Sequence, residues 1–101
     1  MNQLRLSARL VEAAALRYTP AGLPALDVQL EHVSEVQALG QPRQVRLMLK
    51  ALALGAVAER LARQAIGSQW LVEGYLASPR QGRQVVLHIQ NFQQDPFQGA
   101  S

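Results

Sequence analysis

Hydrophobic and polar residues alternate with a period of two in several short segments, the pattern of half-buried β-strands. It predicts five strands, over residues 4–10, 26–33, 44–50, 69–76 and 84–90. In the third strand the expected inward residues are Val45, Leu47 and Leu49, and the outward residues are Arg46, Met48 and Lys50. Turn residues separate the segments: a Pro or Gly, or both, stands in every gap. The chain is therefore expected to be built mainly of strands.

A helix is predicted between the third and fourth strands, over residues 56–65. The run is rich in strong helix formers, places Val57, Leu61 and Ala65 on one face, and ends before Gly67. Residues 8–16 and 45–66 are rich in Ala and Leu, so periodicity alone leaves a helical alternative open for both. Gly74 lies inside the fourth strand, which indicates a bulge or a tight bend.

The order of three strands, a helix and two strands is that of the oligonucleotide-binding (OB) fold, a five-stranded Greek-key barrel. We therefore predict an all-β fold of this class, with its short helix between strands three and four. One domain is expected over residues 1–92, followed by a flexible C-terminal tail over residues 93–101, whose Pro, Gly and Gln residues are typical of frayed ends.

Positive charge gathers in the middle of the chain. The net charge of the 101 residues is +3, yet residues 36–66 hold five of the ten cations and a single acid. Nine of the ten cations are arginine, which binds phosphate with two parallel hydrogen bonds, so a polyanionic partner is favoured. Without cysteine or an apolar run long enough to span a membrane, the chain is expected to be cytoplasmic, with no membrane association.

Seven short motifs carry a resemblance to a known family. Taken in their order and spacing, they resemble the primosomal replication protein N (PriB) family: NQLRLS (2–7), PAGLP (20–24), LEH (30–32), RQ (43–44), IGS (66–68), VEGY (72–75) and VLH (86–88). The resemblance implies a homodimer of OB folds that binds single-stranded DNA and acts as an adaptor in replication restart. It also implies three partners, the PriA helicase, the DnaT protein and DNA coated by single-strand binding protein, and neither catalysis nor a cofactor.

The resemblance also implies which residues contact DNA. The basic position at the end of the first strand corresponds to Arg17, the loop between the last two strands supplies Arg80 and Arg83, and the entry to the third strand supplies Arg43. Two positions depart from the family: Arg46 stands where a stacking aromatic is expected, and Gln41 replaces an aromatic just before that strand. The loop is also poorer in cations than is usual for the family. Binding here is therefore expected to depend more on charge than on stacking.

The strand pattern itself adds two candidates. Lys50 is expected on the same outer face as Arg46 and close to Arg43, where it would contact phosphate. Tyr18 follows Arg17 at a strand end and is the best remaining stacking residue. Trp70 and Tyr75 are expected to be core or dimer contacts instead.

Other functions fit the sequence less well. A protein-interaction module of the primosome with weak or lost DNA binding is the main alternative, because the aromatics are missing. A protein that coats long single strands would be expected to carry a Gly/Pro-rich linker and an acidic tip. His32 and His88 lack the spacing of a metal site, and no catalytic motif is found, so neither a metal nor an enzyme is expected.

Overall fold

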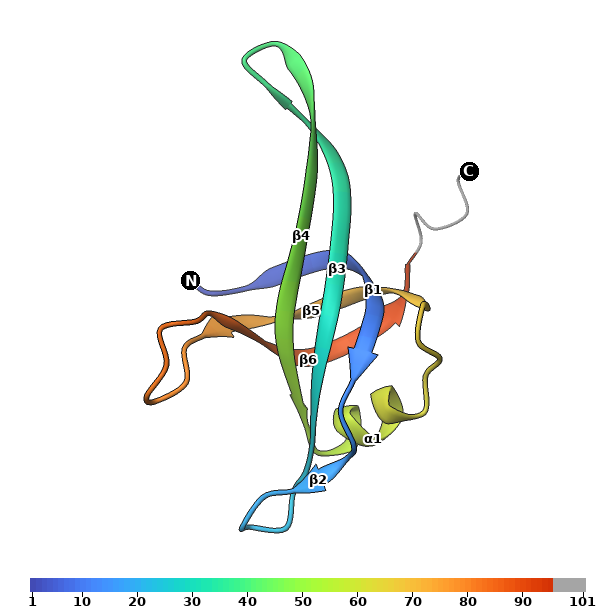
Figure 1. Ribbon diagram of the computed structural model, residues 1–101, viewed down its shortest axis with the longest axis vertical. Helices are drawn as coiled ribbons and strands as arrows, with labels where there is room; N and C mark the ends of the chain where they lie inside the picture. Colours follow the sequence, from blue (N-terminus) through green and yellow to red (C-terminus); the bar gives the residue numbers. More distant parts are fainter. Residues whose placement is uncertain (96–101) are drawn as a thin grey trace.

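Six strands and one helix follow one another in residues 1–95, the part of the chain that this computed structural model describes (Figure 1). They are β1 (Leu4–Ala13), β2 (Arg17–Tyr18), β3 (Pro24–Ala38), β4 (Gln41–Leu54), α1 (Ala56–Ala62), β5 (Gln69–Ala77) and β6 (Val86–Gln94). The five predicted strands and the helix after the third are confirmed. The two-residue strand β2 was not predicted, and a helix is excluded for most of residues 8–16.

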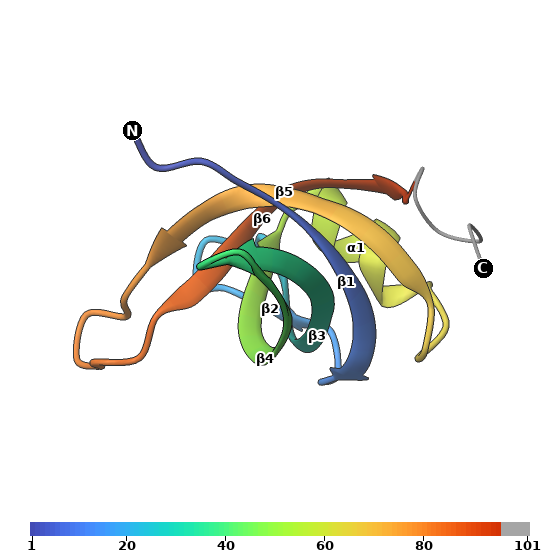
Figure 2. The ribbon, with the colours of Figure 1, turned by 90° about the horizontal axis from the view of Figure 1, so that it is seen from above.

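The strands close into a barrel because β1 pairs on both sides. Their order is β1-β5-β6-β4-β3-β2, and an additional β1–β3 pairing joins the two ends. Only β4 and β6 are parallel, and the other pairs are antiparallel. Viewed along the long axis, β1 and β5 arch over the coiled β3–β4 hairpin, with α1 beside them (Figure 2). This is the predicted OB-type barrel, with its single helix between β4 and β5.

The barrel is filled by the inward residues of the predicted alternation. Leu10, Leu26, Leu30 and Leu87 are fully buried, and α1 contributes Ala58 and Leu61 to the same cluster and so covers one end of the barrel. Burial of such side chains stabilises a fold by about 1.5–3 kcal/mol each relative to exposure.

The β5–β6 ladder is irregular at Gly74, as its position in the sequence predicted, and the extra residue is Gln90 of β6. The β5–β6 register shifts between Glu73 and Gly74, which marks a bulge. A Cβ atom at Gly74 would overlap the carbonyl oxygen of His88 on the neighbouring strand. Only glycine therefore allows the two backbones to approach so closely at this bulge.

The hairpin of β3 and β4 extends well beyond the barrel, and we call its outer part, residues 33–46, the β3–β4 arm (Figure 1). Its ladder continues to Ala38 and Gln41, whereas β1 pairs with β3 only up to Glu31. The expectation that Val45 and Leu47 face the interior was wrong. Val45 lies in the arm and is only half-buried, and Leu47, at its base, is exposed, because there is no barrel interior at this distance.

The C-terminal boundary differs slightly from the prediction. Strand β6 continues to Gln94, two residues beyond the expected end of the domain at residue 92. Of the tail predicted over residues 93–101, residues 96–101 lie outside the described part of the chain.

Candidate nucleic-acid interface

The outer face of β3 and β4 carries several of the predicted cations. Arg46, Met48 and Lys50 alternate along β4 with the exposed Leu47 and the half-buried Leu49, and all three are exposed on one face, as predicted. Their partners on β3 are Val33, Glu31 and Gln29. The face therefore mixes cations with an acid rather than forming a purely basic stripe.

Glu31 lies between two arginines on this face. Its carboxylate accepts a hydrogen bond from Arg9 Nη2 at 3.0 Å, and Arg46 Nη1 is 4.0 Å from its other oxygen. The Arg46 side chain remains 66% exposed. Because Glu31 is already bound by Arg9, the contact to Arg46 is the weaker one, and the Arg46 guanidinium is able to turn toward a phosphate.

Arg17 is held more firmly. It lies in β2, not at the end of the first strand, because β1 ends at Ala13 and a short link separates the two. Its Nε donates to Asp27 Oδ2 at 2.9 Å. This hydrogen bond, together with the charge of the carboxylate, raises the pKa of Arg17 above its ordinary value. Arg17 is therefore cationic but already neutralised by its partner.

Arg43 is separated from the other cations of β4. It pairs with Val36 in the β3–β4 arm, three residues from Arg46, and successive residues of a strand point to opposite faces. The expectation that Arg46 and Lys50 lie close to Arg43 was therefore wrong, because Arg43 is on the opposite face of β4. Arg43 instead projects from the other side of the arm, near the turn at Leu39 and Gly40, both of which have positive φ.

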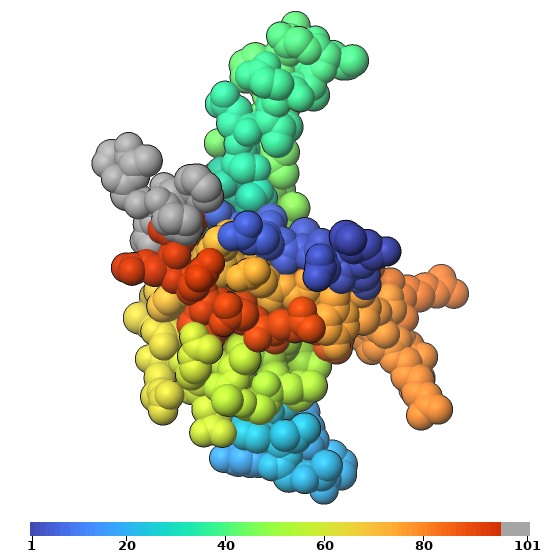
Figure 3. Space-filling model, turned by 180° about the vertical axis from the view of Figure 1, so that it is seen from behind, coloured from blue at the N-terminus to red at the C-terminus, as the bar shows by residue number. Residues whose placement is uncertain are grey.

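The loop between β5 and β6, residues 78–85, carries Arg80 and Arg83, both exposed. The space-filling view shows this β5–β6 loop as a separate projection from the barrel, like the β3–β4 arm (Figure 3). Lys50 lies at its base: Ala51 pairs with Leu87, and Lys50 and Val86 line one groove. The structure therefore brings Lys50 near the foot of the loop that carries Arg80 and Arg83.

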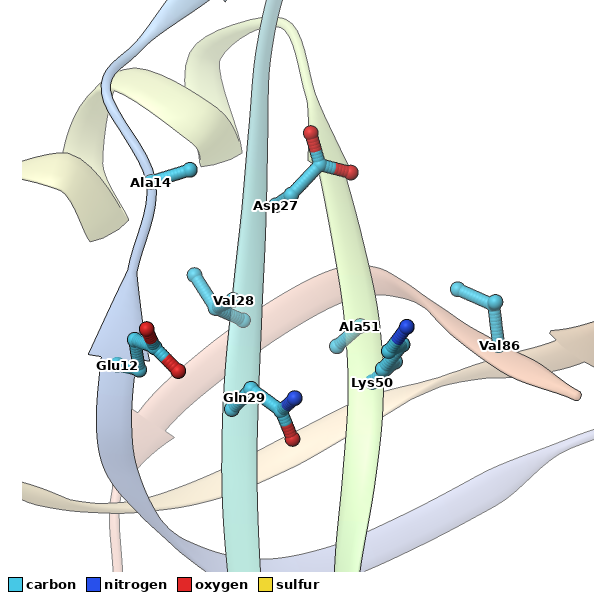
Figure 4. Close-up of a pocket in the computed structure, with 8 residues that line it drawn as sticks. All are labelled: Glu12, Ala14, Asp27, Val28, Gln29, Lys50, Ala51 and Val86. Carbon is cyan, nitrogen blue, oxygen red and sulfur yellow. The ribbon is translucent and has the colours of Figure 1, made fainter. Parts of the chain in front are cut away.

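That groove has a volume of about 340 Å³ and lies on the outer side of β1, β3 and β4 (Figure 4). Lys50 and Gln29 reach into it from neighbouring strands, and Glu12 and Asp27 add two carboxylates. With two acids and one lysine, the groove itself does not favour phosphate. The surface with unpaired cations, which would favour phosphate, begins at Lys50 and continues toward Val86 and the β5–β6 loop.

The aromatic side chains are distributed over several parts of the barrel. Tyr18 is 66% exposed beside Arg17, as its predicted stacking role requires. Trp70 is half-buried, donates to Ser68 Oγ at 2.7 Å and meets the Phe92 ring edge-on, so it packs against the core. Arg60 of α1 lies over the other ring of that pair, 4.5 Å from the Phe92 centroid, and so has a structural contact.

One ring pair was missed by the sequence reasoning. Tyr75 and His88 are opposite each other in the β5–β6 ladder and stack with centroids 4.9 Å apart and planes at 11°. Neither residue belongs to the described hydrophobic core. The only signal in the sequence is that each stands close to the same loop, before and after it.

His32 has a structural role in the described part of the chain. Its Nδ1 is 2.7 Å from the carbonyl oxygen of Ser7, to which it donates, and its Nε2 is 2.7 Å from Ser34 Oγ. The imidazole thus links β3 to β1 just beyond the last β1–β3 pair. Within residues 1–95 there is no group of three or more His, Cys, Asp or Glu side chains able to hold a metal ion, and no helix is long and apolar enough to cross a membrane.

The predicted site residues thus form separate groups. Lys50 is near the foot of the β5–β6 loop that carries Arg80 and Arg83. Strand β2, with Arg17 and Tyr18, and the tip of the β3–β4 arm lie toward opposite ends of a molecule about 50 Å long (Figure 1). A compact ligand could not reach them all. Only a long, flexible ligand could contact all of them at once.

The OB-type barrel with exposed cations is typical of single-strand-binding proteins, and similarity to known proteins places the chain in this class. Residues 2–91 match the family described as "Another single-strand binding protein family". The chain is 50% identical to replication restart protein PriB of Bordetella pertussis over 91 residues, covering 89% of this chain and 85% of that one. For PriB of Neisseria gonorrhoeae the identity is 38%, covering 92% and 93%. The chain belongs to the PriB family of replication restart proteins, whose members bind DNA and are not enzymes.

Solved structures agree with this assignment. PriB from Ralstonia solanacearum superimposes with a TM-score of 0.85 at 35% identity, covering 93% of this chain and 97% of that one. The single-stranded DNA binding protein from Thermus aquaticus gives a TM-score of 0.74 at 29% identity, and its match covers 99% of this chain but only 52% of that protein. The barrel is thus shared with single-strand-binding proteins beyond PriB.

Proposed function

We propose that this protein is a single-stranded-DNA-binding adaptor of replication restart that works as a homodimer in the cytoplasm. The observation that carries the proposal is the group formed by Lys50, Arg80 and Arg83. All three are exposed on the same side of the barrel, around the foot of the β5–β6 loop. None of them makes an ion pair in the described residues. Unpaired cations attract phosphate, and release of the ions condensed on DNA then drives binding.

The proposed path of the strand uses all seven candidate residues in different ways. Lys50, Arg80 and Arg83 hold the backbone at the barrel, and Arg43 extends the contact along the β3–β4 arm. Arg46 and Arg17 keep their carboxylate partners, lie along the path and contribute little net charge to phosphate binding. Tyr18 offers an exposed ring to a base. An OB fold covers about 4–16 nucleotides, which is consistent with such a distributed contact.

A free strand edge supports the homodimer. Strand β1 pairs with β5 from Leu4 to Arg9, but with β3 only from Arg9 onward. The other edge of β1 before Arg9 therefore has no strand beside it in the described chain. An unpaired edge is a template for another strand, and the same edge of a second copy would satisfy it with two-fold symmetry.

The proposed protein partners follow from membership of the family: a restart helicase of the PriA type, DnaT, and DNA coated by single-strand binding protein. The exposed apolar side chains of the β3–β4 arm, Val33, Val36 and Leu39, offer a surface for such contacts. They also favour the second candidate function, a protein-interaction module with weak or lost DNA binding, because the arm holds Gln41 and Arg46 where aromatics were expected.

A titration of labelled oligo-dT by fluorescence anisotropy at 50 mM salt distinguishes the two functions. We expect saturable binding at micromolar protein, weakened steeply by added salt. No binding under these conditions would refute the adaptor as proposed and favour the protein-interaction module. Sedimentation equilibrium of the same sample tests the homodimer, which a monomer at micromolar concentration would contradict.

A further inference from the structure

The stacked rings of Tyr75 and His88 lie on the outside of the barrel. Leu87 and Ile89, the neighbours of His88 in β6, are buried in the core, so the alternation of the strand turns His88 outward. Tyr75 faces it across the β5–β6 ladder with nearly parallel planes. The stack is only partly buried, which leaves ring surface for a further flat group.

A groove with a mixed lining, including Gln90, runs beside the two rings. It has a volume of about 270 Å³, and its other walls include Leu52, Leu54 and Val57. Leu52 is the direct neighbour of His88 in the β4–β6 ladder, so leucine, imidazole and phenol form one row across three strands. The volume is just below the ~300 Å³ at which small-ligand pockets begin, which suits one planar ring system rather than a whole cofactor.

Cations stand near this groove on neighbouring segments of β4 and the β5–β6 loop, and two nearby acids are paired. Lys50 is two residues from Leu52 on the same face of β4, and the β5–β6 loop with Arg80 and Arg83 leaves β5 only two residues after Tyr75. Two residues of a strand span about 7 Å. Asp27, opposite Leu52, is bound to Arg17, and Glu73 is 3.7 Å from Arg5.

We propose that the Tyr75–His88 pair is a base-stacking site for single-stranded DNA, with Lys50 and the β5–β6 loop holding the phosphates on either side. The inference rests on the proposed function and names a new contact within it. A groove beside two stacked rings, with unpaired cations on the neighbouring segments, matches the two parts of a nucleotide, its base and its phosphate, and stacking on an aromatic accepts every base. The ring pair thus supplies the stacking that the missing aromatics of the arm do not.

The test compares Tyr75→Leu, which keeps apolar volume but removes the ring, with Tyr75→Phe, which keeps the ring. Oligo-dT affinity should fall about tenfold in Tyr75→Leu and stay within about twofold of the parent in Tyr75→Phe. The slope of affinity against salt should be the same in all three proteins, because no phosphate contact is removed. Photo-crosslinking of the unmodified protein to 5-iodouracil oligonucleotides should label Tyr75 or His88.

Several results would overturn the inference. Unchanged affinity in a folded Tyr75→Leu variant, or crosslinks confined to other residues, would refute the stacking site while the proposed function stands. Conversion of Tyr75→Leu to a monomer with full affinity per chain would identify the rings as a contact between copies instead. If the unmodified protein fails to bind oligo-dT, the proposed function itself fails, and the stacking site with it. Should Tyr75→Leu not fold, the crosslinks still decide.

Discussion

The salt dependence of DNA binding should separate the paired cations of the interface from the unpaired ones. Two of the six candidate cations, Arg17 and Arg46, contact carboxylates, whereas four make no ion pair in residues 1–95: Arg43, Lys50, Arg80 and Arg83. Each neutralised phosphate of a single strand contributes about −0.7 to the slope of log affinity against log salt. Four contacts therefore predict a slope of about −2.8.

The perturbations are Arg80→Gln and Arg17→Gln. Loss of Arg80 should flatten the slope to about −2.1, so that the fall in affinity between 50 and 200 mM salt shrinks from about fiftyfold to about twentyfold. Loss of Arg17 should change the slope much less, because Asp27 already neutralises it at 2.9 Å. Asp27→Asn is the matched control: it frees Arg17 and should steepen the slope by about 0.7.

Anisotropy titrations with labelled oligo-dT at four or more salt concentrations measure these slopes. An unchanged slope in Arg80→Gln would refute the β5–β6 loop as a phosphate contact. If Arg17→Gln flattened the slope as much as Arg80→Gln does, the argument from the ion pair would be wrong, since Arg17 would then leave Asp27 for DNA without a penalty.

Three further substitutions test the fold around the site. Gly74→Ala should lower the free energy of unfolding by about 1–3 kcal/mol in urea titrations, because its methyl group would collide with the His88 carbonyl; unaltered stability would contradict the bulge. Leu39→Asn should raise the free energy of unfolding by about 1 kcal/mol, because Leu39 has a φ of 54° in a turn where Asn-Gly is favoured. A lower free energy of unfolding would argue against a left-handed conformation at this residue. Arg60→Gln should lower the melting temperature by a few degrees by removing the contact to the Phe92 ring while leaving oligo-dT affinity intact; weaker DNA binding would instead assign the helix to the interface.

Local sequence predicted most of the elements because their signals are local. The alternation in residues 4–10 and 26–33 requires only that one face of each strand be buried. In the predicted strand 44–50 the same rule fails at Val45 and Leu47, because there the arm leaves the barrel. The two-residue strand β2 was not predicted, because two residues are too few to show an alternation of hydrophobic and polar positions. The resemblance to the family located Arg80 and Arg83 correctly in a loop.

Which candidate residues act together could not be read from the sequence. Arg43 and Arg46 are three residues apart yet project from opposite faces of the arm, whereas Tyr75 and His88 are thirteen apart and stack. Nothing in the sequence indicated that Arg17 is paired, whereas in the fold Asp27 of β3 lies beside it.

The sequence by itself determined the strands, the helix and the family, because period, propensity and motif order are properties of neighbouring residues. Tertiary structure alone decided which charges are neutralised and which rings meet. Both the ion pairs and the ring contacts depend on the register between strands that are distant in the sequence. A shift of one residue, such as the one in the β5–β6 register at Gly74, changes which side chains face the core and which face the surface.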